Sequence, residues 1–183
     1  YDQLEAAFET LERRVAAGEL EQYGVATWEA LRVEPDDDAY LSLAEIEERA
    51  AAAAAAVGNE TSHLAAIQLP FNVGMADAFT VEGHPSPDGD GRTSALWYAR
   101  EAGLHVFASA SLLQGQLADG LPEAVAGTLA GETAAQRAIN FARSAPGVTS
   151  ALVGTGSPTH VAENVGAGTF EPLGAEAFDA VFE

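Results

Sequence analysis

The sequence contains no lysine, and all eight of its basic residues are arginines. With 28 Asp and Glu residues, the formal net charge of the 183-residue chain is −20. Binding to nucleic-acid phosphates needs clustered cations, so we expect no nucleic-acid partner. An anionic membrane is disfavoured for the same reason, and no apolar run approaches the ~20 residues that span a bilayer. We therefore expect a cytoplasmic protein without nucleic-acid or membrane partners.

Cysteine is also absent, which excludes disulfides, thiol catalysis and thiolate metal sites. Acidic residues gather at positions 36–38 and 45–48. Such charge runs usually form solvated surface, and we interpret them so; a carboxylate metal site is the alternative, and we predict no metal ligand. The acidic, lysine-free and alanine-rich composition resembles that of haloarchaeal cytoplasmic proteins. A halophilic chain of this charge needs salt to screen its own repulsion.

The length corresponds to a single domain over residues 1–183. Apolar residues at Leu4, Phe8, Leu11 and Val15 follow helical spacing and predict a helix over residues 1–17. Ser42 is a good N-cap and predicts a second helix over 42–58. The remaining pattern predicts helices at 94–103, 132–147 and 157–168, strands at 20–27, 63–73, 104–113 and 148–155, and a flexible surface loop at 79–94 that contains His84.

The predicted elements alternate helix and strand along the whole chain, and the strands carry nearly continuous apolar runs. This pattern predicts an α/β fold with a parallel sheet, whose functional residues follow the carboxyl ends of the strands. Four parallel strands leave two open edges and, when curved like a barrel wall, one uncovered apolar face. The sequence therefore indicates half of an eight-stranded (βα)8 barrel. Because Tyr1 already lies in a helical pattern, we expect the chain to be part of a longer protein.

A glycine-rich turn joins the last predicted strand to the last helix. Gly154, Thr155 and Gly156 end the strand, Ser157 is a good N-cap, and Pro158 suits the first helical position. The first amides of a helix lack intrahelical partners and carry partial positive charge, so this turn predicts an anion site for a phosphate group. A tight turn without a ligand is the alternative.

The sequence resembles the C-terminal half of the aldo-keto reductase family, NADP-dependent (βα)8 barrels. Residues 8–28, "FETLERRVAAGELEQYGVATW", are similar to the family's fourth helix and fifth strand, "AFxxLxxLxxxGKIRxIGVSxW". "IQLPFN" is similar to its sixth strand, and "GLHVFASASLLQGQL" to the seventh strand and following loop, "GIxVxAxSPLxxGxL". "AINFARSAPGVTSALVGTGSPTHVAENVGA" is similar to the seventh helix, eighth strand and adenosine-phosphate helix. The resemblance implies strands 5–8 of a TIM-type barrel.

The resemblance also implies a dinucleotide site on this half. Gln68 would bond the nicotinamide amide, residues 154–156 would meet the pyrophosphate or ribose phosphate, and Glu163 with Asn164 would bond the adenine. Trp28 would line the substrate pocket, with packing on the core as the alternative. The implied cofactor-binding residues are Thr27, Gln68, Ser109, Ser111, Leu112, Gln114, Gly115, Gly154, Thr155, Gly156, His160, Glu163 and Asn164.

The chain departs from the family pattern at several of these positions. Many relatives have a lysine at the position of Gly154 and an arginine at that of His160, both of which grip the 2′-phosphate of NADP. The family's Ser-Asn pair is Ala26-Thr27 here, and its "SPL" is "ASL" at residues 110–112. The resemblance implies NADP as the cofactor, and the missing cations keep NAD open as the alternative.

The family's acid–base machinery is a tyrosine tuned by a lysine, with an aspartate and a histidine, all from the first four strands. This chain has no lysine, and Tyr23, Tyr40 and Tyr98 occupy none of the required positions. We therefore predict no catalytic residue in this chain.

Three functions follow as hypotheses. The first is the C-terminal portion of an NAD(P)-dependent oxidoreductase for small aldehydes and ketones, inactive without a complementing N-terminal half. The second is a non-catalytic half-barrel that forms a homodimer and binds a nucleotide. The third is a phosphate-binding barrel of the aldolase or isomerase type, which is disfavoured because the chain has no Schiff-base lysine and no paired carboxylates at its strand ends.

Overall fold

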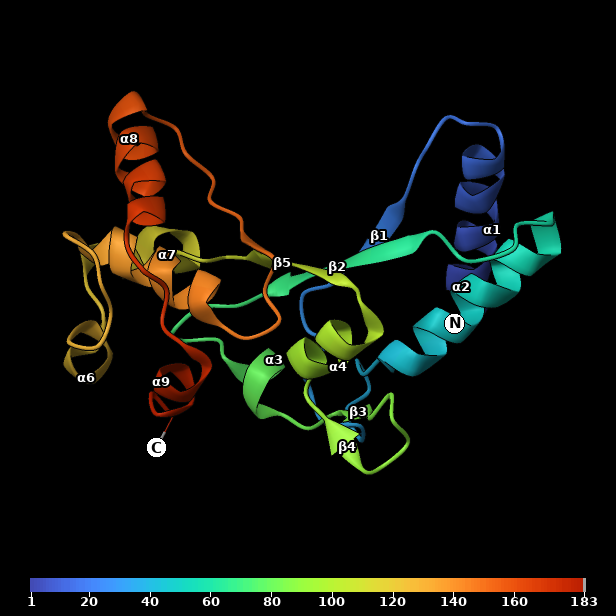
Figure 1. Cartoon of the computed structure of the whole chain (residues 1–183), viewed down its shortest axis with the longest axis horizontal. Coiled ribbons are helices and arrows are strands. Elements are labelled where there is room, and N and C mark those ends of the chain that lie inside the picture. The colour runs from blue at the N-terminus through green and yellow to red at the C-terminus, as the bar shows by residue number, and fades with distance from the viewer. Residues whose placement is uncertain (183) are drawn as a thin grey trace.

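The computed structural model describes residues 1–182, and a parallel sheet lies at its centre (Figure 1). Its strands are β1 (Tyr23–Ala26), β2 (Leu64–Pro70), β5 (His105–Ser109) and β6 (Ser150–Ala151), in the order β1-β2-β5-β6. Every neighbouring pair is parallel. The predicted α/β fold with four parallel strands is confirmed.

The predicted helices form at the expected places. They are α1 (Asp2–Ala16), α2 (Leu43–Val57), α4 (Ala95–Ala102), α7 (Ala134–Ser144) and α8 (Pro158–Gly166). The Ser42 side chain accepts a hydrogen bond from Glu45 N, and Thr133 forms a full capping box with Gln136. Capping residues that satisfy the free helix amides therefore mark the helix starts in the sequence as in the structure.

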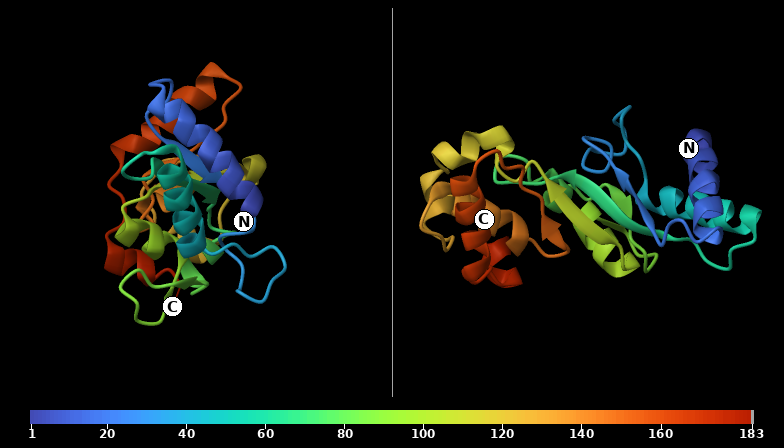
Figure 2. Two further views of the ribbon diagram at one scale, coloured as in Figure 1. Left: turned by 90° about the vertical axis from the view of Figure 1, so that its right-hand side faces the viewer. Right: turned by 90° about the horizontal axis from the view of Figure 1, so that it is seen from above.

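The sheet has one covered and one open face. Ile67, Leu69, Val106 and Ala108 are fully buried beneath the helices. The alternate residues of the same strands belong to the opposite face, which carries Gly24, Ala26, Ala66, Gln68 and Phe107 and remains partly exposed. The right-hand view of Figure 2 looks onto the strands from above. β1 and β6 are the two edge strands, so the expected open edges and uncovered face are both present among the described residues.

All four strands are shorter than the ranges predicted for them, and the backbone shows why the last two end where they do. The strand predicted at 148–155 pairs only over Ser150–Ala151, because Leu152 N makes the last bond to the neighbouring strand, at Ala108 O (2.8 Å). Beyond it the chain leaves the sheet toward α8. The strand predicted at 104–113 ends at Ser109, because Ala110 adopts a left-handed backbone conformation (φ 54°) that no strand contains.

The prediction of a flexible surface loop at 79–94 was wrong around His84. This segment contains the end of α3 (Asp77–Thr80) and an antiparallel pair, β3 (His84–Pro85) with β4 (Arg92–Thr93). The His84 ring is buried: Nδ1 accepts from Leu43 N (3.2 Å) and Nε2 donates to Leu31 O (3.0 Å). Burial lowers the pKa of His84, so the neutral ring fixes the loop against α2.

Besides α3, β3 and β4, five further short elements were not predicted. They are η1 (Leu113–Gly115), α5 (Gln116–Asp119), α6 (Glu123–Ala126), η2 (Ala167–Thr169) and α9 (Ala175–Asp179). Each has three to five residues, which is too short for a helical period to show in the sequence. In residues 1–182 no helix is long and apolar enough to cross a membrane.

Candidate functional site

A cavity of about 790 Å³ lies at the carboxyl ends of β5 and β6. Its walls come from the segments that follow β1, β5 and β6, together with α5, α7 and α8. Its volume falls in the usual range for small-molecule sites. The lining residues are Trp28, Ala110, Ser111, Leu112, Gln114, Gly115, Ala118, Asp119, Ala135, Leu152, Val153, Gly154, His160, Glu163 and Asn164.

Unbonded backbone amides gather on the β6–α8 side of the cavity. Ser157 caps α8 by accepting from His160 N (3.2 Å), and Pro158 opens the helix, as predicted. Within residues 1–182, the amides of Gly154, Thr155, Gly156 and Thr159 donate no hydrogen bond. A Cβ built on either glycine would meet no atom within 4 Å, so a ligand can approach the backbone closely. Free amides at the positive end of a helix are a physical match for a phosphate group.

A strained loop forms the opposite wall. Ala110, Leu113 and Gln114 all have left-handed φ angles (54°, 46° and 55°), which cost non-glycine residues on the order of 1–3 kcal/mol each. Asn72 holds this loop: its buried side chain donates to Ala110 O (2.9 Å) and accepts from Gly74 N (2.8 Å). The sequence reasoning did not select Asn72, although an amide directly after an apolar strand is a signal for a buried positioning residue.

The structure brings together most of the predicted cofactor and substrate residues. Those in the wall of the cavity are Trp28, Ser111, Leu112, Gln114, Gly115, Gly154, His160, Glu163 and Asn164. Those outside its wall are Thr27, Gln68, Ser109, Thr155 and Gly156.

Thr27 and Trp28 directly follow β1, and Trp28 lines the cavity. Thr27 N donates to Gln68 O (2.8 Å), whereas its buried Oγ1 has no hydrogen-bond partner in the described structure. A buried hydroxyl without a partner is rare in folded proteins and marks a place for a ligand or water. Trp28 is 53% exposed, so its indole forms cavity wall and is not core packing.

Gln68 lies apart from the main cavity, on the open face of the sheet. It lines a smaller hollow of about 240 Å³ with Ala26, Ala66 and Phe107. Its side chain is partly exposed and makes no hydrogen bond within residues 1–182, because nothing in this part of the chain covers that face.

Two hydroxyl groups of the predicted site are already engaged. Asn164 Nδ2 donates to Thr155 Oγ1 (3.1 Å), which ties α8 back to the turn before it. Ser111 is buried, and its Oγ donates to Ala108 O (3.2 Å). Thr155 Oγ1 accepts its bond and keeps its own proton free to donate, whereas the Ser111 proton is engaged and its oxygen can only accept a further bond.

The cavity wall is acidic. In the part of the chain that the structure describes, Asp119 and Glu163 line it, no arginine does, and His160 is the one basic side chain in its wall. Among residues 1–182, no group of three or more His, Asp or Glu side chains is placed to hold a metal ion.

No protein-family model and no curated protein matches the sequence. Solved structures do match: an aldo-keto reductase from Bacillus halodurans, in its holo form, is similar over 96% of this chain and 54% of its own, with a TM-score of 0.59 and 17% identity. A thermostable aldo-keto reductase in complex with epalrestat is similar over 97% of this chain and 53% of its own, with a TM-score of 0.61 and 20% identity. The chain has the fold of half an aldo-keto reductase.

This half-barrel spans about half the length of the solved aldo-keto reductases that it matches. The expectation of half a (βα)8 barrel is thereby confirmed at the level of the fold. The main cavity lies at the carboxyl ends of the strands, the end at which barrels of this class place their active sites.

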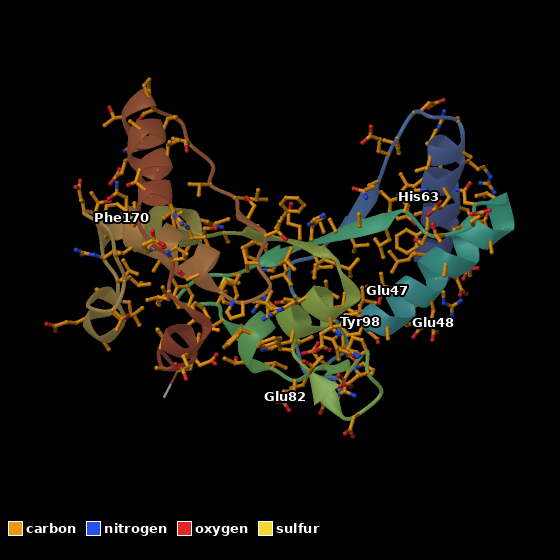
Figure 3. All side chains as sticks on the ribbon, in the orientation of Figure 1. Glu47, Glu48, His63, Glu82, Tyr98 and Phe170 are labelled. Atoms are coloured by element: carbon orange, nitrogen blue, oxygen red, sulfur yellow. The ribbon has the colours of Figure 1, made fainter. Side chains whose placement is uncertain are left out.

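The four tyrosine hydroxyls of the half-barrel are bonded away from the cavity. Tyr23 donates to Glu12 (2.8 Å), Tyr98 to Glu47 (2.5 Å) and Tyr40 to Gly83 O (2.7 Å), while Tyr1 accepts from Ser42 N (2.7 Å). Figure 3 shows Tyr98 beside Glu47 at the junction of α4 and α2. Burial raises the pKa of Tyr23 and Tyr98, and the neighbouring carboxylates raise it further. No tyrosine lines the cavity in the described part of the chain.

Proposed function

We propose that this chain is the C-terminal, dinucleotide-binding half of an NAD(P)-dependent oxidoreductase that reduces aldehydes or ketones. The observation that carries the proposal is the set of free amides at residues 154–156 and 159, which stands beside a cavity at the carboxyl ends of the strands. When bound, the dinucleotide supplies the hydride. The resemblance favours NADP, with NAD as the alternative, and the composition favours the cytoplasm of a halophile.

Each wall of the cavity has a role toward such a ligand. The amides of Gly154 and Gly156 and the N-terminus of α8 hold phosphate oxygens. Asn164 and Glu163 bond the adenine, and the loop at 110–115 covers the pyrophosphate. Gln68 and Thr27 are assigned to the nicotinamide end, since both carry unpartnered polar side-chain atoms.

This half contributes no proton donor for carbonyl reduction. Its tyrosine hydroxyls are bonded elsewhere, and the sequence has no lysine to tune one. General acid catalysis needs a donor within hydrogen-bond reach of the carbonyl oxygen. We therefore infer that the chain is inactive alone and that a complementing N-terminal half supplies the acid and part of the substrate pocket.

The shape of the open sheet face favours a complementing half over a second copy of this chain. The face carries the small residues Gly24, Ala26 and Ala66 on β1 and β2. Barrel interiors are filled by layers of bulky side chains, so two identical halves would leave voids where these residues meet. Large inward-facing residues on a different half would fill the same space. A non-catalytic homodimer remains the alternative, because the two open edges and the uncovered face can also pair with a second copy.

Calorimetric titration of the chain with NADPH and with NADH, in molar salt, tests the proposal. A Gly154→Val variant places a side chain on the cavity wall, and overlap of this kind costs about 1–3 kcal/mol, or about 5- to 150-fold in Kd. Gly168→Val is the matched control: a Cβ on either glycine meets no atom within 4 Å, neither has a positive φ, and Gly168 lies outside the cavity wall. We expect loss of affinity in the first variant alone.

Equal loss in both variants, or no binding of either dinucleotide by the wild type, contradicts the proposed site. The oxidation of NADPH and NADH in the presence of a panel of aldehydes tests the second claim, that the chain is inactive alone. We expect no rate above background from the chain alone. A rate that survives purification would show that a local group replaces the missing acid.

A further inference from the structure

The loop between β1 and α2, residues 29–42, contains no helix or strand and depends on other parts of the chain for its position. The β3–β4 hairpin and the residue before it hold the loop from one side. His84 Nε2 donates to Leu31 O (3.0 Å), and the Tyr40 hydroxyl donates to Gly83 O (2.7 Å). The loop therefore stays in place only while these bonds between distant segments persist.

The buried ring of His84 is bonded at both of its nitrogens. Nε2 donates to Leu31 O in the loop, and Nδ1 accepts from Leu43 N (3.2 Å), the first residue of α2. Both bonds require the neutral ring with its proton on Nε2, because a protonated Nδ1 cannot accept. A second proton would turn an N–H group toward the Leu43 N–H, at the positive end of the α2 dipole.

The groups around the ring do not favour a positive charge on it. Arg92 of β4 has the same charge as a protonated ring, and the rings of Tyr40 and Tyr98 lie 5.7 and 6.0 Å from it. Glu47 of α2, which contacts Tyr98, already accepts from that hydroxyl (2.5 Å). Burial lowers the pKa of His84 from the ordinary 6.5 and Arg92 lowers it further, although the bond to the loop carbonyl acts in the opposite direction.

A second link holds the loop from α3 and connects it to the cavity wall. Arg32 pairs with Asp77 (2.6 Å), whose side chain is 48% exposed, so that molar salt screens this pair. Arg32 Nε also donates to Trp28 O (2.9 Å), and Trp28 lines the cavity. A change at Leu31, the residue before Arg32, is therefore passed to the wall of the cavity.

We propose that His84 is an acid-sensitive latch, whose protonation releases the loop at 29–42 from the hairpin and from α2 and loosens the cavity wall at Trp28. The latch goes beyond the proposed function and holds whether or not a dinucleotide binds. The released ring takes up a proton at the ordinary pKa of 6.5, whereas the latched ring does so at a lower pH. The latched form is thus fully favoured above pH 6.5 and loses stability as the pH falls below it.

Hydrogen exchange in molar salt, from pH ~7.5 to ~5, tests the latch. Protection factors remove the intrinsic pH dependence of exchange. Those of the Leu41 and Leu43 amides should fall at least ~fivefold over this range, because opening takes up one proton, while those of β2 and β5 stay constant. Constant protection at both amides, or an equal loss in the two strands, would overturn the latch.

The variant His84→Gln keeps a donor for Leu31 O but cannot take up a proton, so its protection factors should not depend on pH. His105→Gln is the matched control, because it makes the same substitution at an exposed histidine and should behave as the wild type does. An equal loss of protection in His84→Gln and in the wild type excludes His84 as the latch.

A chain with His84 as its sole histidine keeps the proposal testable if His84→Gln does not fold. The three substitutions that give it are His63→Gln, His105→Gln and His160→Gln. The loss of protection at low pH must persist in this chain, and its disappearance would overturn the latch.

Tryptophan fluorescence tests the connection to the cavity wall. The chain has two tryptophans, so Trp97→Phe leaves Trp28 as the reporter. Acrylamide quenching of Trp28 should increase below pH 6.5 and should not do so when His84→Gln is added. An increase that persists with His84→Gln and disappears with His160→Gln would assign the proton to His160 of the cavity wall and overturn the connection.

Discussion

Glu12 offers the sharpest test of how this half-barrel is stabilised. Its carboxylate is fully buried and accepts four hydrogen bonds. The donors are Tyr23 OH (2.8 Å), Asn59 Nδ2 (2.7 Å), His63 N (2.8 Å) and His63 Nδ1 (2.8 Å). One side chain thus joins α1 to β1 and to the segment between α2 and β2, and Figure 3 shows His63 next to α1.

Replacing Glu12 by alanine removes the acceptor for all four donors. A hydrogen bond to a charged group contributes about 1.5–3 kcal/mol, and the buried Tyr23 hydroxyl would lose its main partner. Water reaches the half-buried Asn59 and His63 and replaces part of the loss, so we expect Glu12→Ala to lower the free energy of unfolding by about 3 kcal/mol. Glu12→Gln keeps one acceptor oxygen but turns an NH₂ group toward donors. It should therefore lower the free energy of unfolding by about half as much as Glu12→Ala does.

Urea unfolding in molar salt, followed by circular dichroism, measures the difference. Glu9→Ala is the matched control on the same helix, because Glu9 makes only a solvent-exposed pair with Arg13 (2.6 Å), of a kind that contributes ~0.2–1 kcal/mol. The urea m-value should stay the same in all variants. A Glu12→Ala loss no larger than that of Glu9→Ala would refute the reasoning.

Three further predictions follow from the same structure. Burial favours the neutral form of Glu12, but the hydrogen bonds from His63, Asn59 and Tyr23 outweigh it and hold its pKa below the ordinary 4.5. A lowered folded-state pKa stabilises the fold above the unfolded pKa, so the Tm gap between wild type and Glu12→Gln should narrow as the pH falls below 4.5. Asn72→Ala removes the side-chain bonds to Ala110 O and from Gly74 N and leaves Gly74 N without a partner, so it should lower stability by about 1–3 kcal/mol and speed amide exchange at 110–115, measured by hydrogen exchange. The Tm should fall as KCl is lowered from molar to ~0.1 M, because the 28 acidic groups lose screening; a Tm that is flat or rises would reject a halophilic protein.

The parts of the fold that were predictable are those in which local and tertiary preferences agree. Helices α1 and α2 have a clear apolar period or a clear cap, and both form within two residues of the prediction. The turn at 154–158 was predictable because each residue has a local structural preference: the glycines leave the backbone accessible, Ser157 is the N-cap, and Pro158 takes the first helical position. The resemblance added residues such as Trp28 and Ser111, which share no sequence period with the turn.

The parts that were not predictable depend on contacts between distant segments. The sequence places His84 in a Gly- and Asp-rich loop, where a polar residue is expected to be exposed. Its ring is buried because the Leu43 amide donates to it and the Leu31 carbonyl accepts from it. α9 is five residues long and exists because Phe178 packs at a tilt against Phe141 and edge-on against Phe79. The backbone at Ala110 is held in a strained conformation by Asn72, which lies 38 residues earlier. No local propensity encodes such pairs.

The residues that stabilise the fold lie at one end of the sheet and the residues assigned to binding lie at the other, and this separation can be tested. The Glu12 network lies at the amino ends of the strands, since Tyr23 begins β1 and His63 directly precedes β2. The strained loop at 110–115, the free amides at 154–156 and the unpartnered Thr27 hydroxyl all lie at the carboxyl ends. Unsatisfied groups and strain persist only where the rest of the fold compensates for them. Glu12→Gln should therefore lower stability while leaving dinucleotide Kd unchanged under folded conditions, and Gly154→Val should do the reverse. A Kd that rises as much in Glu12→Gln as in Gly154→Val would mean that the cavity is not a separately organised site.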